Sequence, residues 1–387
     1  MKKVIYILLC SLQLLTCPAY SDIKTTDQTE QLLQELTEAH AAPGFESSVR
    51  KILLRIWTPS MSKIKIDGMK NIIGFFPSSK NKPKILIMAH MDEVGFYVKD
   101  ITNEGFLRID QAGGWIDQTI LSQRWIIMTS KGPVIGYSGI ESGHAITSFP
   151  TVPPISSKEM FIDIGASSKK EVLEIYGIRP GLPITPDTKF VLLNNSGRYL
   201  AKALDDRAAL AVMTELLRRL NKQILPNQII YVATVQEELG SRGAQVISNS
   251  VHPDIVINLE VSVAKDFPLL AAPKQDRGHP FLGGGPSIFV YDHSMVPDNT
   301  LIEWIINLAR KNKIPFQFEN EPLYGEDGRF LQVSGNGVPT VNIGIPVRYA
   351  HQNSGILQRS DYDATVSLVE KIVLTLSQSE VDAIKNK

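Results

Sequence analysis

The chain has 387 residues, of which 43% are hydrophobic and 21% are charged, a composition close to that of an ordinary soluble globular protein. Its 40 basic and 40 acidic residues balance to a formal net charge of zero. Nothing therefore favours nucleic acid or a membrane surface as a partner, because such partners select for clustered Lys and Arg. At this length, we expect one large domain or two of medium size.

The N-terminal segment has the pattern of a secretory signal peptide. Two lysines precede an apolar stretch (residues 4–17) that is too short to span a bilayer comfortably, and small residues precede a cleavage site after Ser21. We expect residues 1–21 to be removed on export, leaving a periplasmic or secreted protein without stable membrane association. An anchoring helix and a lipoprotein cut before Cys17 are alternatives. Both cysteines lie in this segment, so the mature chain would contain neither disulfides nor cysteine-bound zinc.

The first part of the mature chain predicts helices followed by strands. Apolar residues recur at helical spacing over 26–40 and 47–57. Short strands are expected at 62–66, 71–76 and 84–89. The last of these is nearly all apolar, as is typical of a parallel strand buried on both faces.

The region 95–188 differs from the sequence on either side of it. Short alternating runs are interrupted by Gly, Pro and Ser, and a helical pattern occurs only around 169–176. This predicts a small, β-rich, barrel-like domain inserted into a larger one. The larger domain would then consist of residues 22–94 and 189–387.

Helices and strands alternate again beyond the predicted insertion. Such alternation predicts an α/β fold with a mixed, largely parallel sheet and helices on both of its faces. The expected helices span 210–220, 301–312 and 366–376, and the expected strands span 229–235, 255–259 and 339–345.

Titratable side chains stand at or near the ends of these predicted strands, or at the start of a helix. They are His90, Asp205, Glu237, Glu238, Glu260 and His351. Zinc, cobalt and manganese in hydrolytic sites take imidazole and carboxylate ligands, and two such ions about 4 Å apart share a bridging carboxylate. The set therefore predicts a two-metal hydrolase centre. Asp92 is placed to accept the second N–H of His90.

Structural roles are open for the same residues. A histidine that follows an apolar strand, such as His90, is often a core residue. Asp205 is also placed to cap a helix, and adjacent Glu237 and Glu238 suit a solvated strand end. Glu326, Asp327 and Arg329 either contact substrate or cap a helix, and the sequence leaves both readings open.

Separated motifs make the chain resemble the M42 aminopeptidases, the group of glutamyl and tetrahedral aminopeptidases within the H clan of metallopeptidases. The resemblance covers essentially the whole mature chain, in order and with similar spacing. It rests on HMDEVGF at 90–96, GGW at 113–115, ALDDR at 203–207, VQEELGSRGA at 235–244, VSVAKDFP at 261–268 and RYAH at 348–351.

The resemblance implies a zinc-aminopeptidase-like fold and a dinuclear aminopeptidase acting on peptide substrates. Two divalent ions per subunit, zinc or cobalt with manganese as a further option, would generate a bridging hydroxide, with Glu237 as the general base. The inserted domain would build a homo-oligomer, as in the dodecamers of relatives. The implied ligands are Asp205 as the bridge, His90 and Glu260 for one ion, and Glu238 and His351 for the other.

Two positions depart from the family pattern. The family usually has Asp where this chain has Glu260, and its GGTDA-like segment is replaced by LYGEDGR at 323–329. These departures keep open a metal- or peptide-binding homologue without turnover. A glycoside hydrolase is the weaker alternative, because adjacent Glu237 and Glu238 cannot flank a sugar.

Overall fold

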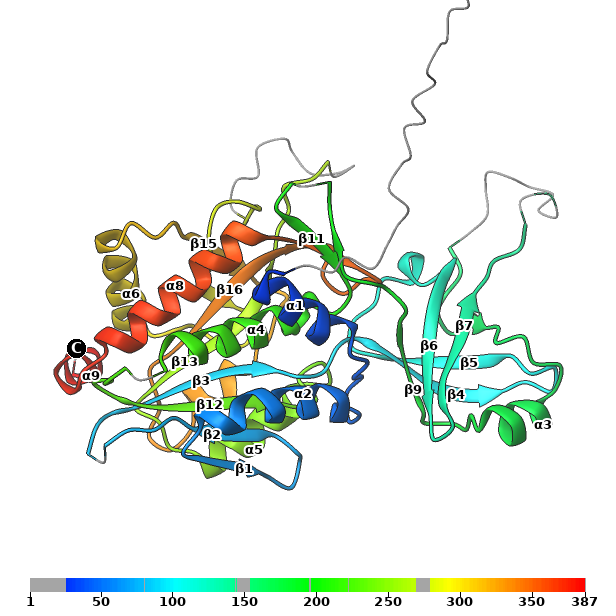
Figure 1. Ribbon diagram of the computed structural model, residues 1–387. Helices are drawn as coiled ribbons and strands as arrows, with labels where there is room; N and C mark the ends of the chain where they lie inside the picture. The colour runs from blue at the N-terminus through cyan, green and yellow to red at the C-terminus, as the bar shows by residue number, and fades with distance from the viewer. Residues whose placement is uncertain are drawn as a thin grey trace, which may run out of the picture.

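The computed structural model describes residues 26–386 except 80, 143, 145–153, 195, 222 and 269–278. The expected signal peptide (1–21) lies outside the described residues, so its removal stays a prediction. In the described part of the chain, no helix is long and apolar enough to cross a membrane. Figure 1 shows a larger body of helices packed on a sheet, and a smaller body made mainly of strands.

The larger body is built on an eleven-stranded mixed sheet, and its central strands β12, β3, β13 and β16 run parallel. β14 (Ser287–Asp292) pairs with β16, and β15 (Gln317–Glu321) pairs with β14. This confirms the predicted mixed α/β fold. The main path of the sheet is β1 (Lys63–Ile66), β2 (Ile72–Phe75), β12 (Gln228–Thr234), β3 (Lys84–His90), β13 (Ile255–Val263), β16 (Thr340–Arg348), β17 (Gly355–Gln358), β11 (Arg198–Ala201) and β10 (Val191–Leu192).

Both faces of this sheet are covered, which explains why its central strands carry apolar residues on both faces. In β3, Ile85 and Ile87 belong to one hydrophobic core, whereas Leu86 and Met88 belong to the core on the opposite face. The first core is covered by α1 (Gln28–Glu38), α2 (Ser47–Trp57), α4 (Leu204–Arg219), α6 (Asn299–Lys311), α8 (Arg359–Thr375) and α9 (Gln378–Lys385), and the second by α5 (Arg242–Ser250) and α7 (Gly328–Gln332).

The smaller body is a six-stranded antiparallel sheet. A bridge between Tyr137 and Asp163 brings its two edges together, so the sheet is nearly a closed barrel. Its core is centred on Phe96, Trp115 and Trp125, and α3 (Lys169–Glu171) lies outside the sheet. The strands are β7 (Gly132–Ser138), β6 (Gln123–Thr129), β9 (Pro183–Pro186), β4 (Gly95–Ile101), β5 (Leu107–Ala112) and β8 (Phe161–Ile162).

The sequence patterns missed some elements and ended two strands too early. The strand expected at 339–345 continues to Arg348 as β16. β13 continues to Val263, so the expected end of this strand at residue 259 is wrong, and Glu260 lies within the strand. β15 gave no strand signal because its burial is the reverse of the usual pattern. Glu319 and Glu321 are buried there, whereas Phe318 is 48% exposed.

His40 connects the two bodies at the end of α1. Its Nδ1 lies 2.8 Å from Oγ1 of Thr185 in β9. Burial, helped by the nearby Lys202 ammonium, lowers the pKa of His40 to about 4. The imidazole is therefore neutral in the folded protein at pH values where an unfolded chain already binds a proton.

Lowering the pH from 7 to 5 should cost the wild type about 2 kcal/mol more of its free energy of unfolding than it costs His40→Asn. Between about pH 4 and 6.5 the unfolded state binds more protons at His40 than the folded state does. Stability in this window therefore rises with pH and is lost as the pH falls. Urea unfolding of both proteins at the two pH values measures the difference, and equal losses would contradict the account.

Candidate metal centre

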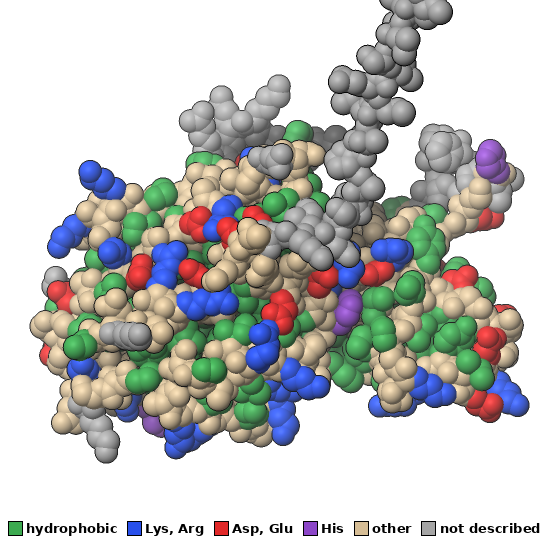
Figure 2. Space-filling view, in the orientation of Figure 1, with side chains coloured by type: hydrophobic (Ala, Val, Ile, Leu, Met, Phe, Trp, Pro, Cys, Tyr) green, Lys and Arg blue, Asp and Glu red, His purple; other side chains and the backbone are tan. Residues whose placement is uncertain are grey.

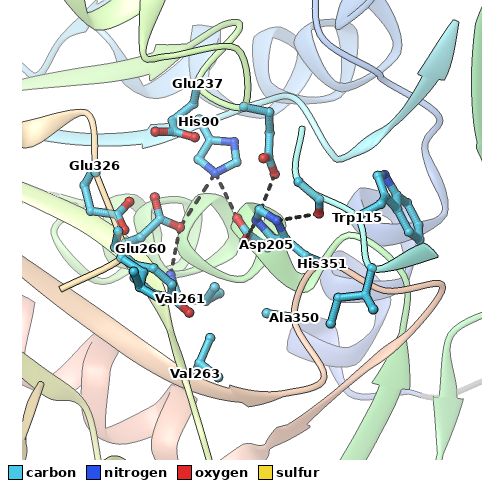
Figure 3. Close-up of a pocket in the computed structure, with 16 residues that line it drawn as sticks. His90, Trp115, Asp205, Glu237, Glu260, Val261, Val263, Glu326, Ala350 and His351 are labelled. Atoms are coloured by element: carbon cyan, nitrogen blue, oxygen red, sulfur yellow. Dashed lines mark hydrogen bonds and ion pairs between the residues drawn. The ribbon is translucent and has the colours of Figure 1, made fainter. Parts of the chain in front are cut away.

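The side chains singled out in the sequence lie around one pocket at the carboxyl ends of the parallel strands. This pocket has a volume of about 480 Å³ (Figure 3). His90 is the last residue of β3, Asp205 is in the first turn of α4, and His351 follows β16. The structure brings together His90, Asp205, Glu237, Glu238, Glu260 and His351.

Asp205 lies between the two histidines and contacts both. Its Oδ1 is 2.9 Å from Nε2 of His90, and its Oδ2 is 3.2 Å from Nε2 of His351. Each imidazole also has a second carboxylate beside it. Oε1 of Glu260 is 3.6 Å from Nε2 of His90, and Oε1 of Glu238 is 3.5 Å from Nε2 of His351. One bridging carboxylate thus joins two imidazole–carboxylate pairs.

Both imidazoles are oriented by backbone carbonyl groups. Nδ1 of His90 lies 3.1 Å from the Asp92 carbonyl oxygen, and Nδ1 of His351 lies 3.0 Å from the Gly114 carbonyl oxygen. With the proton on Nδ1 donated to these carbonyls, each Nε2 presents its lone pair to the centre of the site. Gly114 follows β5, so the smaller body helps to orient a side chain of the larger one.

The Asp92 carboxylate has a different contact from the one expected. It lies 3.7 Å from Nδ1 of His90, beyond hydrogen-bonding distance. Instead, Oδ1 accepts the backbone N–H of Glu237 at 3.0 Å and Oδ2 accepts that of Glu238 at 3.1 Å. Asp92 therefore fixes the loop that carries both glutamates, and its main-chain oxygen, not its carboxylate, orients His90.

Left-handed backbone conformations occur where the chain enters the site. Ala203, Gln236 and His351 have φ values of 52°, 54° and 56°. Such values are uncommon for residues other than glycine, and they cluster at functional sites where the surrounding structure holds them in place. The turn at Gln236, just beyond β12, allows Glu237 and Glu238 to line the same pocket.

The site has more carboxylate groups than its two imidazoles can neutralise. Burial raises the pKa of Glu238 to about 7, although His351 opposes the shift. Burial would lower the pKa of His351, but the charges of Glu238 and Asp205 outweigh it and raise that pKa to about 10. The electrostatics of the pocket therefore favour positive charge at its centre.

The donor set fits divalent metal ions. Ligand atoms of His90, Asp205 and Glu238 lie within 4.8 Å of one another, as do those of His90, Asp206 and Glu260. Oε1 of Glu238 and Oδ1 of Asp206 are buried and have no hydrogen-bond partner within the described ranges. Imidazole nitrogen with carboxylate oxygen is the donor set of zinc and its neighbours in hydrolytic sites. Asp206 was not singled out in the sequence, where only its place beside Asp205 marked it.

A buried network of charged side chains lies next to the segments that carry His90 and Asp205. Nζ of Lys202 is 2.6 Å from Oε2 of Glu93, and Nη2 of Arg207 is 3.4 Å from Oε1 of the same glutamate. Arg207 also donates to the Met91 carbonyl at 2.9 Å. All three charged side chains are buried. The network ties the segment after β3 to the start of α4, and so holds His90 and Asp205 in register. Sequence reasoning gave Glu93 and Arg207 no role beyond their place in motifs, and it did not single out Lys202.

Lys202→Met should lower the free energy of unfolding by about 3 kcal/mol, because it leaves Glu93 buried with less compensating charge. The matched control is Lys99→Met, which breaks the 2.9 Å pair with Asp110, whose side chains are both more than half exposed. The control should change stability by less than about 1 kcal/mol. Denaturant unfolding measures both, and equal effects would show that the buried network has no special role.

The segment at 323–329 contributes one carboxylate to the pocket. Glu326 is buried and lies beside Glu260 (Figure 3). The Asp327 carboxylate instead accepts a hydrogen bond from Thr234 at 2.5 Å. Nη2 of Arg329 lies 3.4 Å from Oγ of Ser241. Asp327 precedes α7, but its side chain makes no capping hydrogen bond. Of the three predicted residues, only Glu326 lines the pocket.

Fold and site together define an α/β protein with a candidate metal centre at the carboxyl ends of a parallel sheet. A family model described as M42 glutamyl aminopeptidase matches residues 70–368. The Escherichia coli K12 protein FrvX, whose name calls it an aminopeptidase, is 39% identical over 91% of this chain and 97% of its own. A lysyl aminopeptidase from Pyrococcus furiosus is 31% identical over 89% of this chain and 96% of its own.

Solved structures of similar fold are also aminopeptidases or peptidases. A TET aminopeptidase from a marine-sediment Thaumarchaeota archaeon has a TM-score of 0.87 and 34% identity, over 92% of this chain and 100% of its own. The TET1 peptidase of Pyrococcus horikoshii has a TM-score of 0.79 and 27% identity, over 90% of this chain and 100% of its own. That peptidase is described as assembling into a tetrahedron or a large octahedral shell. The chain belongs to the M42 glutamyl aminopeptidase family, as its motifs predicted, and it is a peptidase.

Proposed function

We propose that the protein is a dinuclear metallo-aminopeptidase in which Asp205 bridges two divalent ions. The observation that carries the proposal is the pair of contacts that Asp205 makes, one carboxylate oxygen to each imidazole. His90 and Glu260 would complete one site, and His351 and Glu238 the other. Asp206 lies close enough to His90 and Glu260 to support the first of these.

Glu237 is suited to moving protons. Among the described residues, the groups able to share one ion include Glu238 but not Glu237. Glu237 lines the pocket, accepts a hydrogen bond from Ser241 at 2.9 Å, and has a pKa raised well above its ordinary value by burial and neighbouring carboxylates. When bound, the metals would acidify a water and polarise the scissile carbonyl. Glu237 would take the proton of the attacking water and pass it to the leaving amine.

The charge of the pocket favours the amino end of a peptide. In the described part of the chain, the lining includes Asp205, Glu238, Glu260 and Glu326, but no lysine or arginine. A peptide carries a positive charge at its α-amine, and a carboxylate-lined pocket attracts that charge. The carboxyl end of a peptide would be repelled. This supports removal of residues from the N-terminus.

A homo-oligomer is also proposed, formed through the smaller body. Figure 2 shows hydrophobic side chains across the surface of this body. The exposed hydrophobic residues of the smaller body include Ile135, which is 60% exposed, Tyr137 at 47% and Ile175 at 66%. Exposed apolar groups of this size support an interaction surface on the smaller body. The assembled state described for the TET1 peptidase supports the same conclusion.

Release of chromogenic amine from aminoacyl anilides should disappear after dialysis against a chelator and return with cobalt or zinc. Glu237→Gln should lower kcat by at least about a hundredfold while metal content stays unchanged, because the lost group moves a proton and binds no ion. The matched control is Glu174→Gln, at an exposed glutamate of the smaller body, which should keep full activity. Full activity in Glu237→Gln would overturn the mechanism.

A further inference from the structure

Another group of potential metal ligands lies apart from the pocket, beside the edge strand β15. Glu319 and Glu321 are alternate residues of this strand, so their side chains lie on the same face. His279 lies shortly before β14, the strand that pairs with β15. One ligand atom from each of these three residues lies within 4.8 Å of the other two. None of the three lines the pocket that holds Asp205.

Glu319 is the unusual member of this group. Its side chain is fully buried, and neither carboxylate oxygen has a hydrogen-bond partner among the residues that the structure describes. Burial, reinforced by the charge of Glu321, raises its pKa to about 8. Burying a carboxylate without a partner is unfavourable unless a cation or a proton compensates for it. The position of Glu319 therefore needs an explanation that its protein contacts do not supply.

Lys265 supplies part of the compensating charge. Its Nζ is 2.8 Å from Oε2 of Glu321 and 3.4 Å from Nε2 of His279. The ammonium is thus directed at Glu321, and Glu319 has no hydrogen bond to it. The Lys265 side chain is 30% exposed. Because its long stem can swing the ammonium into water, the lysine can leave when another cation enters.

We propose that His279, Glu319 and Glu321 form a separate cation site that binds a divalent first-row transition metal, with Lys265 as a built-in competitor. One imidazole nitrogen and two carboxylate oxygens suit Zn²⁺ or Mn²⁺, whereas Ca²⁺ and Mg²⁺ prefer oxygen alone. The backbone N–H of Tyr324 donates to the Glu321 carbonyl at 3.3 Å, and Tyr324 lines the pocket. An ion here would brace the turn that brings Tyr324 to the active site.

The test compares the metal content of the full chain and of two matched variants. Each protein is stripped with chelator, dialysed against Zn²⁺ or Mn²⁺ and measured by plasma mass spectrometry. Glu319→Gln should hold one ion per chain fewer than the wild type. Glu303→Gln makes the same chemical change at an exposed position of α6 and should match the wild type. Because the result is a difference, it does not depend on how many ions the Asp205 centre binds.

Two further variants protect the test against a folding defect. His279→Gln removes a ligand from a partly exposed position, leaves the buried carboxylates intact, and should also lose one ion. Lys265→Met removes the competing charge and should tighten binding of that ion by at least about tenfold. Equal metal content in the wild type, Glu319→Gln and His279→Gln at saturating metal would overturn the proposal, whatever the activity of the enzyme.

Discussion

The constraint on which the site depends is an excess of buried carboxylates gathered around two imidazoles. Asp205 sits between His90 and His351, and Glu238 and Glu260 stand beside them. Carboxylates at this density repel one another in a poorly hydrated pocket and are stable only when cations share the space. The pKa of His351 is raised to about 10 because the same carboxylates favour a positive charge on the imidazole. The metal ions that we propose would supply this positive charge, and the proposed reaction depends on them.

The fold satisfies this constraint by joining distant segments at one edge of a sheet. Parallel strands deliver His90, the Glu237–Glu238 loop and Glu260 to the same side. In the buried network, Lys202 and Arg207 neutralise the charge of Glu93. This network fixes the segment after β3 against the start of α4. The smaller body also takes part, because the Gly114 carbonyl orients His351. The loop that contains Gly114 thus links the smaller body to the site.

Much of the site could be predicted because strand ends and motifs are local features of a sequence. His90, the Glu237–Glu238 pair and Glu260 stand beside apolar runs, and Asp205 and His351 lie in M42 motifs. The main-chain contact of His90 with the Asp92 carbonyl could not be predicted, since a residue pattern does not show which oxygen faces an imidazole. The strand β15 was missed because its buried residues, Glu319 and Glu321, are acidic. A strand is normally recognised by apolar residues at its buried positions.

The central claim is that Asp205 holds two metal ions together, and the metal content of Asp205→Asn tests it most directly. The asparagine keeps the shape of the side chain but loses the charge and the second anionic oxygen that a bridge requires. The variant should bind two ions per chain fewer than the wild type, whereas Asp110→Asn, at an exposed position of the smaller body, should bind as many. Unchanged metal content in Asp205→Asn would contradict the account.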